Sequence, residues 1–198
     1  MNRKLLSMML ALVLVLGLAG SAFAAVPSKT TQDMTTVGTL EVANAVEGAD
    51  QVAITLPAES AAVVSELEKI VAFVNNEGND VVSYFGDAAR EEIAALLPEG
   101  ANVDGMEMNE FAPLALENYS EEFGDITVGF TFATQYTVGQ NLVAMVGVVN
   151  AEGTVDWSAM AAEAQEDGSV KVTFTQEALM SIQNGDAMIA ILSEKAAA

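Results

Sequence analysis

The sequence lacks the side chains that most hydrolytic and metal-dependent sites use. It contains no histidine and no cysteine, which excludes a Ser-His-Asp triad, a Cys-His pair and a standard zinc site. Ser65 and Lys69 have helical spacing, but a serine and a lysine four residues apart are common by chance and do not identify a nucleophile. The sequence therefore predicts no catalytic residues, no metal ligands and no cofactor.

Paired carboxylates are the one catalytic arrangement that the composition leaves open. The densest group is Glu121, Glu122 and Asp125, and two acids that flank a cleft can hydrolyse a glycosidic bond. Sugar-binding clefts are usually lined with aromatic rings, whereas this chain has one tryptophan and three tyrosines. We interpret these acids as a solvated loop, and a small secreted hydrolase that uses paired carboxylates stays as the alternative function.

Motifs for phosphate and calcium are absent or incomplete. Neither of the glycine-rich phosphate-binding patterns occurs. Residues 75–80 (Asn-Asn-Glu-Gly-Asn-Asp) offer several oxygen ligands, but they lack the ligand order of an EF-hand loop and its bidentate glutamate. A polar loop of this kind is expected wherever a helix ends, so the sequence leaves weak calcium binding undecided.

The first 24 residues have the layout of a secretory signal peptide. Arg3 and Lys4 precede an apolar run over residues 5–18, and Ala22-Phe23-Ala24 supplies the small residues of a cleavage site. The alternative is a membrane anchor, but the apolar run is shorter than the about 20 residues that a spanning helix needs. We expect cleavage after Ala24, secretion out of the cell, and no stable membrane anchor.

The charge of the chain limits its partners. It has 28 acidic and seven basic residues, a net charge of −21. Nucleic acid binding depends on lysine and arginine that neutralise phosphates, so a nucleic acid partner is excluded. The favoured function is a non-catalytic interaction module with an unidentified protein or glycan partner. A structural spacer is hard to separate from it, and the carboxylate hydrolase stays as the alternative.

Hydrophobic periodicity predicts an α+β protein in which a small α/β unit precedes a β-rich unit. Residues 25–39 resemble a linker or a frayed strand. The α/β unit spans residues 40–106, with a half-buried strand at 51–56, helices near 58–75 and 87–97, and a short extended run at 81–85. Asp87 is expected to cap the second of these helices.

The period of the apolar residues changes from 3.6 to 2 after residue 109. This change predicts a mostly antiparallel, Ig-like β-sandwich over residues 107–194. Its expected strands cover residues 126–132, 142–149, 154–160, 170–174 and 188–192, with a short helix at 176–182. Because the link between the two units carries apolar residues that a free linker would not expose, we expect the helices to pack on the sandwich.

Three segments of the β-rich unit carry a resemblance. They are Thr127-Val-Gly-Phe-Thr-Phe-Ala133, Val155-Asp-Trp157 and Asp167-Gly-Ser-Val-Lys-Val-Thr-Phe174. With the leader, they resemble uncharacterised secreted proteins of Gram-positive gut anaerobes that carry Ig-like β-sandwich modules. The resemblance covers about half of the chain and implies an extracellular bacterial setting. It implies no activity and no functional residues.

Two tyrosines are the candidate binding residues. Tyr119 and Tyr136 are expected in loops at one end of the sandwich, where amphipathic rings can contact a partner. The alternative is that both rings cap the hydrophobic core. Trp157 alternates with Asp156 and is interpreted as a core residue.

Overall fold

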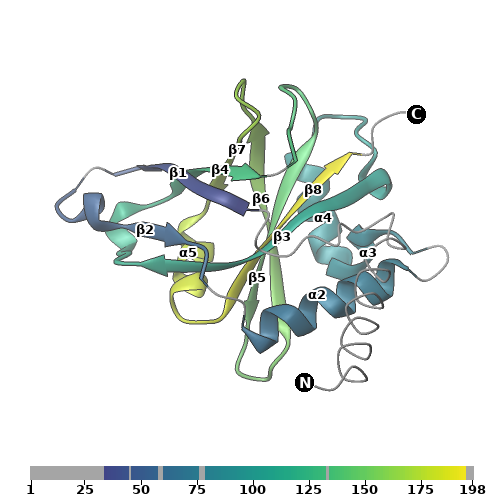
Figure 1. Ribbon diagram of the computed structural model, residues 1–198, viewed down its shortest axis with the longest axis horizontal. Coiled ribbons are helices and arrows are strands. Elements are labelled where there is room, and N and C mark those ends of the chain that lie inside the picture. The colour runs from purple at the N-terminus through teal and green to yellow at the C-terminus, as the bar shows by residue number, and fades with distance from the viewer. Residues whose placement is uncertain (1–33, 45, 58–59, 76–78, 133, 195–198) are drawn as a thin grey trace, which may run out of the picture.

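The computed structural model describes residues 34–194 except 45, 58–59, 76–78 and 133. Within them, eight strands form one antiparallel sheet in the order β1-β4-β7-β6-β5-β8-β3-β2. They are β1 (Met34–Val42), β2 (Ala53–Thr55), β3 (Met106–Glu117), β4 (Ile126–Phe132), β5 (Leu142–Val149), β6 (Val155–Ala164), β7 (Val170–Phe174) and β8 (Ala187–Glu194). Because β1 and β2, at the two ends of this order, contact each other, the sheet is nearly closed (Figure 1).

The predicted α+β class is confirmed, with a mostly β core. The Ig-like sandwich is not confirmed, because the strands follow one another in a single barrel-like sheet. The boundary between residues 106 and 107 falls at the start of β3, and β2 from the first unit pairs with that strand. Residues 34–39, part of the predicted linker or frayed strand, lie in β1. The predicted signal peptide lies outside the described residues.

The interior of the sheet is built by alternation along each strand. In β4, Ile126, Val128, Phe130 and Phe132 are buried, whereas the residues between them are partly or fully exposed. Facing strands contribute aliphatic and aromatic side chains to the same cluster. Short helix α5 (Gln176–Gln183) packs onto this cluster through Leu179 and Ile182. The interior is therefore a packed core.

Three helices cover the outer face of β3, β8, β5 and β6. They are α2 (Ala61–Val74), α3 (Val81–Phe85) and α4 (Asp87–Leu96). The strands direct alternate side chains, such as Met145 and Met188, to this outer face. There they form a second core cluster with the apolar residues of the helices. The helices therefore pack on the strands, as predicted (Figure 1).

Residues 81–85, expected as an extended run, form helix α3 instead. The Asp80 side chain accepts hydrogen bonds from the N–H of Ser83 at 2.9 Å and from its hydroxyl at 2.7 Å, which fixes the helix start. Gly86, with φ 89°, ends α3 and begins α4, so Asp87 is the first residue of α4 and not its cap. A short apolar run does not distinguish strand from helix by periodicity alone.

None of the helices within the described residues has both the length and the apolar character that crossing a membrane requires.

Candidate functional site

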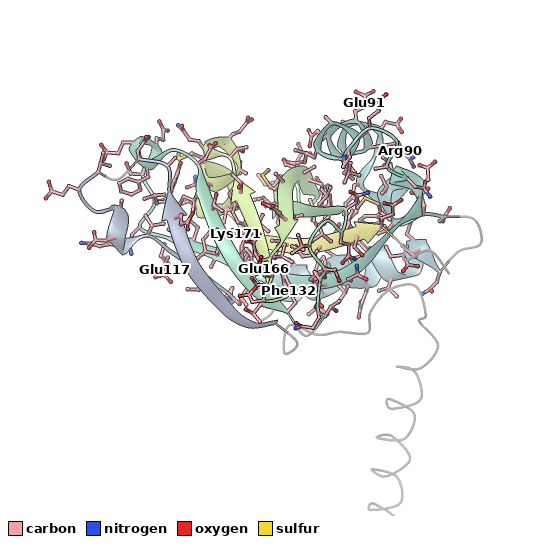
Figure 2. The ribbon with its side chains drawn as sticks, turned by 90° about the horizontal axis from the view of Figure 1, so that it is seen from above. Arg90, Glu91, Glu117, Phe132, Glu166 and Lys171 are labelled. Carbon is pink, nitrogen blue, oxygen red and sulfur yellow. The ribbon has the colours of Figure 1, made fainter. Side chains whose placement is uncertain are left out.

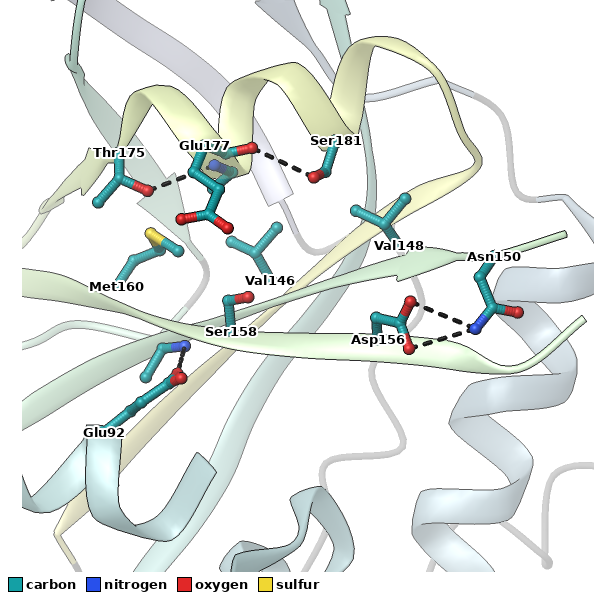
Figure 3. A pocket seen from close by; sticks show the side chains of 12 residues that line it. Glu92, Val146, Val148, Asn150, Asp156, Ser158, Met160, Thr175, Glu177 and Ser181 are labelled. Carbon is teal, nitrogen blue, oxygen red and sulfur yellow. Dashed lines mark hydrogen bonds between the residues drawn. The ribbon is translucent and has the colours of Figure 1, made fainter. Parts of the chain in front are cut away.

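A groove of about 500 Å³ lies beside β6 (Figure 3). Strands β5 and β6 form its floor, α5 forms one wall, and α4 contributes one residue from the opposite side. The residues that line it are Glu92, Val146, Val148, Asn150, Asp156, Ser158, Ala159, Met160, Thr175, Glu177, Ala178 and Ser181. Its lining is rich in hydroxyl and carboxylate groups and small apolar side chains.

The groove exists because β7 is shorter than its neighbour β6. β7 pairs with Ala161–Ala164 of β6 only. After Phe174 the chain leaves the sheet, because Thr175 caps α5 by accepting a hydrogen bond from the N–H of Ala178 at 3.3 Å. Helix α5 then runs over the strands and leaves residues 155–160 of β6 beside an open space.

One backbone donor on this free stretch of β6 is bound by a carboxylate. Glu92 of α4 reaches the edge of the strand, where its Oε2 accepts a hydrogen bond from the N–H of Ala159 at 3.0 Å (Figure 3). Within the part of the chain that the structure describes, no other strand pairs with residues 155–160 on this side. Exposed strand edges can accept a further strand.

The charge of the groove is negative. Glu92, Asp156 and Glu177 contribute carboxylates, and none of its described lining residues is lysine or arginine. Asp156 accepts hydrogen bonds from the Asn150 side-chain amide at 3.2 Å. The cations that the structure describes are engaged elsewhere: Lys69 with Glu66, Arg90 with Asp80 and Asp104, and Lys171 with Glu41. The groove acids therefore have no ion-pair partner within the described residues.

The free stretch of β6 is held in place from its other face by Trp157. The indole ring packs against Phe85 at a centroid distance of 4.9 Å and against Phe111 at 6.5 Å. It lies over Gly147 on β5, where an added Cβ would come within 2.8 Å of the ring. Trp157 is therefore partly buried, packs against the second core cluster and anchors this stretch of β6 to it.

The groove does not have the composition of a sugar-cleaving cleft. It collects three carboxylates, yet none of its described lining residues is aromatic. Two of the carboxylates, on Glu92 and Asp156, already accept hydrogen bonds from the protein. Among the described residues, no three acidic side chains are grouped so that they could hold a metal ion.

Both tyrosines predicted to bind a partner are buried. Tyr119 is 5% exposed and donates from Oη to the carbonyl of Gly124 at 2.9 Å. Tyr136 is 4% exposed and packs its ring against Phe132. Both rings lie in the core, as in the alternative interpretation, and in this conformation neither offers its surface to a partner.

Burial changes the acidity of all three tyrosines. It raises the pKa of Tyr136, together with the nearby charge of Glu110, which is itself buried. It raises the pKa of Tyr119, with the charges of Asp125 and Glu121 adding to the effect. It raises the pKa of Tyr84, whose hydroxyl also donates to the Glu66 carboxylate. Tyr136 Oη is buried and has no hydrogen-bond partner within the described part of the chain.

The other residues considered from the sequence have structural roles. Glu121 lies in a short 3-10 helix (Glu121–Phe123), and Asp125 accepts a hydrogen bond from the N–H of Gln176 at 2.9 Å. Lys69 pairs with buried Glu66. In the loop considered for calcium, Asp80 caps α3 and residues 76–78 lie outside the described residues.

Comparison with models of protein families, with curated proteins and with solved structures found no match. Only the geometry of the groove therefore supports it as a candidate site.

The groove residues were missed because α4, β6 and α5 are far apart in the sequence. One signal was present: the turn at Asp167-Gly168 pairs the strand that starts at Val170 with the end of β6, and Thr175 begins a helix. The short second strand leaves the first half of β6 without a neighbour on that side.

Proposed function

We propose that this chain is a non-catalytic interaction module that acts outside the cytoplasm and binds its partner in the groove between α4, β6 and α5. The observation that carries the proposal is the free edge of β6 beside a groove of about 500 Å³. The leader-like sequence of residues 1–24 supports the extracellular setting. Partners and ligands bind preferentially in concave sites with a few convergent polar groups.

The experiment that tests this proposal fills the groove with a bulky side chain. Ser181 is exposed on α5 and lines the groove, so Ser181→Trp obstructs the space without disturbing the core. The matched control is Glu91→Trp, because Glu91 is exposed on the outer side of α4, away from the groove (Figure 2). Both variants should keep the wild-type circular dichroism spectrum.

Ligands are selected for the immobilised wild-type protein from a displayed random-peptide library and a glycan array. We expect selected ligands to bind Ser181→Trp at least about ten-fold more weakly, and Glu91→Trp as well as the wild type. Selected ligands that bind both variants equally, or the selection of none, would contradict a binding role for the groove.

A further inference from the structure

Building on the proposed function, we infer that the groove binds a cationic polypeptide segment in extended conformation, which adds as a strand to the free edge of β6. The partner is thus a basic peptide segment, and recognition is by strand addition. This mode of binding depends on three features of the described residues: the outward-facing backbone groups of β6, the packing that anchors this stretch, and the surrounding carboxylates, which have no ion-pair partner among the described residues.

The register of the sheet determines which backbone groups of β6 are free. The N–H of Asn150 donates to the carbonyl of Thr154, and the N–H of Val149 donates to Asp186. Even-numbered residues of β5 therefore bond to β6, and odd-numbered ones bond to β8. It follows that Val155, Trp157 and Ala159 direct their N–H and C=O groups away from β5, as the bond from Ala159 to Glu92 confirms.

The free stretch has the length of a short bound peptide. Residues 155–160 span about 20 Å at the rise of an antiparallel strand, enough to lie beside about six residues of a ligand. The N–H groups of Val155 and Trp157 are the donors open to that ligand, because Glu92 holds the N–H of Ala159. Peptides bound in this way gain affinity from main-chain hydrogen bonds and specificity from alternate side chains. Here the even-numbered side chains of Asp156 and Ser158 face the groove, so alternate ligand residues would contact them.

The edge is already ordered before a ligand arrives. Trp157 is fixed between Phe85, Phe111 and the backbone of Gly147. Each of residues 155–160 also pairs with β5 on the other side of the strand. Because little conformational entropy remains to be lost on the protein side, more of the binding free energy is retained.

Charge determines which extended segment is bound. Glu92, Asp156 and Glu177 surround the edge, and the cations of the described residues are paired with other acids. Lysine or arginine side chains of a ligand would supply the missing partners. The net charge of −21 would also accelerate the approach of a cationic segment.

A second copy of the chain is a poor occupant of the same edge. Pairing of two β6 edges would place the groove carboxylates of one molecule against those of the other, and like charges facing each other across an interface oppose association. The free edge with its acidic border therefore favours a partner of opposite charge over self-association.

The first probe is a fluorescein-labelled peptide of about eight residues with lysines on one strand face and threonine and valine on the other. Its affinity is measured by fluorescence anisotropy, beside a version with glutamate for each lysine. Two further versions are N-methylated, one at the odd positions and one at the even positions. The methyl groups remove the backbone donors of one strand edge and leave all charges in place.

We expect the lysine peptide to bind and the glutamate peptide not to bind. Of the two methylated peptides, one should bind like the parent and the other at least about ten-fold more weakly, because only one edge of the peptide bonds to β6. Methylated peptides that both bind like the parent, or that are weakened equally, would overturn strand addition. Equal binding of the glutamate peptide would overturn the preference for cations.

The second test removes the groove carboxylates. The triple variant Glu92→Gln, Asp156→Asn, Glu177→Gln should weaken binding of the lysine peptide by about ten-fold. The control removes the same charge from exposed positions outside the groove lining: Glu91→Gln, Glu117→Gln and Glu166→Gln (Figure 2). It should change the affinity by less than about two-fold. Equal losses in the two triple variants would show that overall charge, and not the groove, attracts the peptide, and would overturn the inference.

Different experimental results would overturn strand addition and the proposed function. Selected ligands that Ser181→Trp excludes, but that are neither cationic nor sensitive to backbone methylation, would leave the interaction module standing and overturn strand addition. A concentration-dependent dimer that Ser181→Trp abolishes would make a second copy the occupant and would also overturn it. If no ligand depends on the groove, both proposals fail together.

Discussion

Replacing each tyrosine by phenylalanine removes the same hydroxyl from three different environments. Tyr84 Oη donates at 2.7 Å to Oε1 of Glu66, a carboxylate that is 4% exposed and that also accepts from Lys69 at 2.9 Å. Tyr119 Oη donates to the neutral carbonyl of Gly124 at 2.9 Å. Tyr136 Oη is buried without a partner within the described residues. The rings, and with them the aromatic contacts, stay in all three variants.

The expected changes in the free energy of unfolding follow from these partners. Tyr84→Phe removes a hydrogen bond to a charged group and should destabilise the protein by about 1.5–3 kcal/mol. Tyr119→Phe removes a hydrogen bond between neutral groups and should cost about 0.5–1.5 kcal/mol. Tyr136→Phe removes an unsatisfied buried hydroxyl and should stabilise the protein by about 1 kcal/mol, the lower end of the cost of leaving such a group unpaired.

The assay is equilibrium unfolding in urea, followed by the fluorescence of Trp157, which is the one tryptophan in the chain. The slope of the free energy against urea should be the same in all variants, so that midpoints report stability. Two results would refute the reasoning. One is a smaller loss for Tyr84→Phe than for Tyr119→Phe, and the other is a loss above about 1 kcal/mol for Tyr136→Phe.

Three further predictions use other parts of the chain. Gly147→Ala places a Cβ 2.7 Å from Val155 Cγ1 and 2.8 Å from the Trp157 ring. This overpacking should destabilise the protein by about 1–3 kcal/mol, whereas replacing a strand glycine by alanine should stabilise it by about 0.5–1 kcal/mol. The net loss in the free energy of unfolding should be about 1 kcal/mol. That loss should shrink in a Trp157→Leu background, as measured by urea unfolding with circular dichroism, and an equal loss in both backgrounds would contradict the contact. Because the pKa values of all three tyrosines are raised in the folded state, unfolded chains lose tyrosine protons near pH 10 before folded ones do. Stability should therefore fall as the pH rises above about 10, and phenolate absorbance of the folded protein should appear at a higher pH than that of the unfolded chain; ionisation of all three tyrosines near pH 10 in the folded protein would refute this. Finally, exported material should begin at Ala25 on N-terminal sequencing, and a retained Met1 would argue against cleavage.

Three strands were predictable from the sequence: the alternating segments 126–132 and 170–174 coincide with β4 and β7, and the continuous apolar run 142–149 coincides with β5. Alternation shows which face of a strand is buried, but it does not show which strand lies beside which. β1 pairs with β4, and β8 inserts between β5 and β3, so the barrel-like sheet, in place of the predicted sandwich, depends on contacts between residues distant in the sequence.

Strand β3 illustrates why a rule based on sequence can mislead. Pro113 lies in the middle of this strand, and proline argues against a central strand because it has no N–H to donate. The structure accommodates it because β2 pairs only with the end of β3, at Ala115–Glu117. Along β3, alternate residues direct their N–H groups toward β8 and away from it, and Pro113 occupies a position that faces away. The N–H that proline lacks would therefore have pointed to the side that β2 leaves free.

The candidate site was less accessible to sequence analysis than the fold. Tyr119 and Tyr136 fit the pattern of amphipathic rings in loops, but composition does not distinguish a loop ring that faces solvent from one that folds back into the core. Glu92 and Glu177 look like ordinary acids on exposed helix faces. They gain a role only because α4 and α5 lie on either side of the same strand edge.

Amide hydrogen exchange of β6, followed residue by residue by NMR, tests the binding groove most directly. The register assigns the N–H groups of Asp156 and Ser158 to β5 and those of Val155 and Trp157 to the free edge. In the protein alone, Val155 and Trp157 should therefore exchange much faster than Asp156 and Ser158, and saturation with the lysine peptide should slow their exchange. Strong protection of Val155 and Trp157 in the protein alone, or exchange unchanged at saturation, would contradict binding of a strand at this edge.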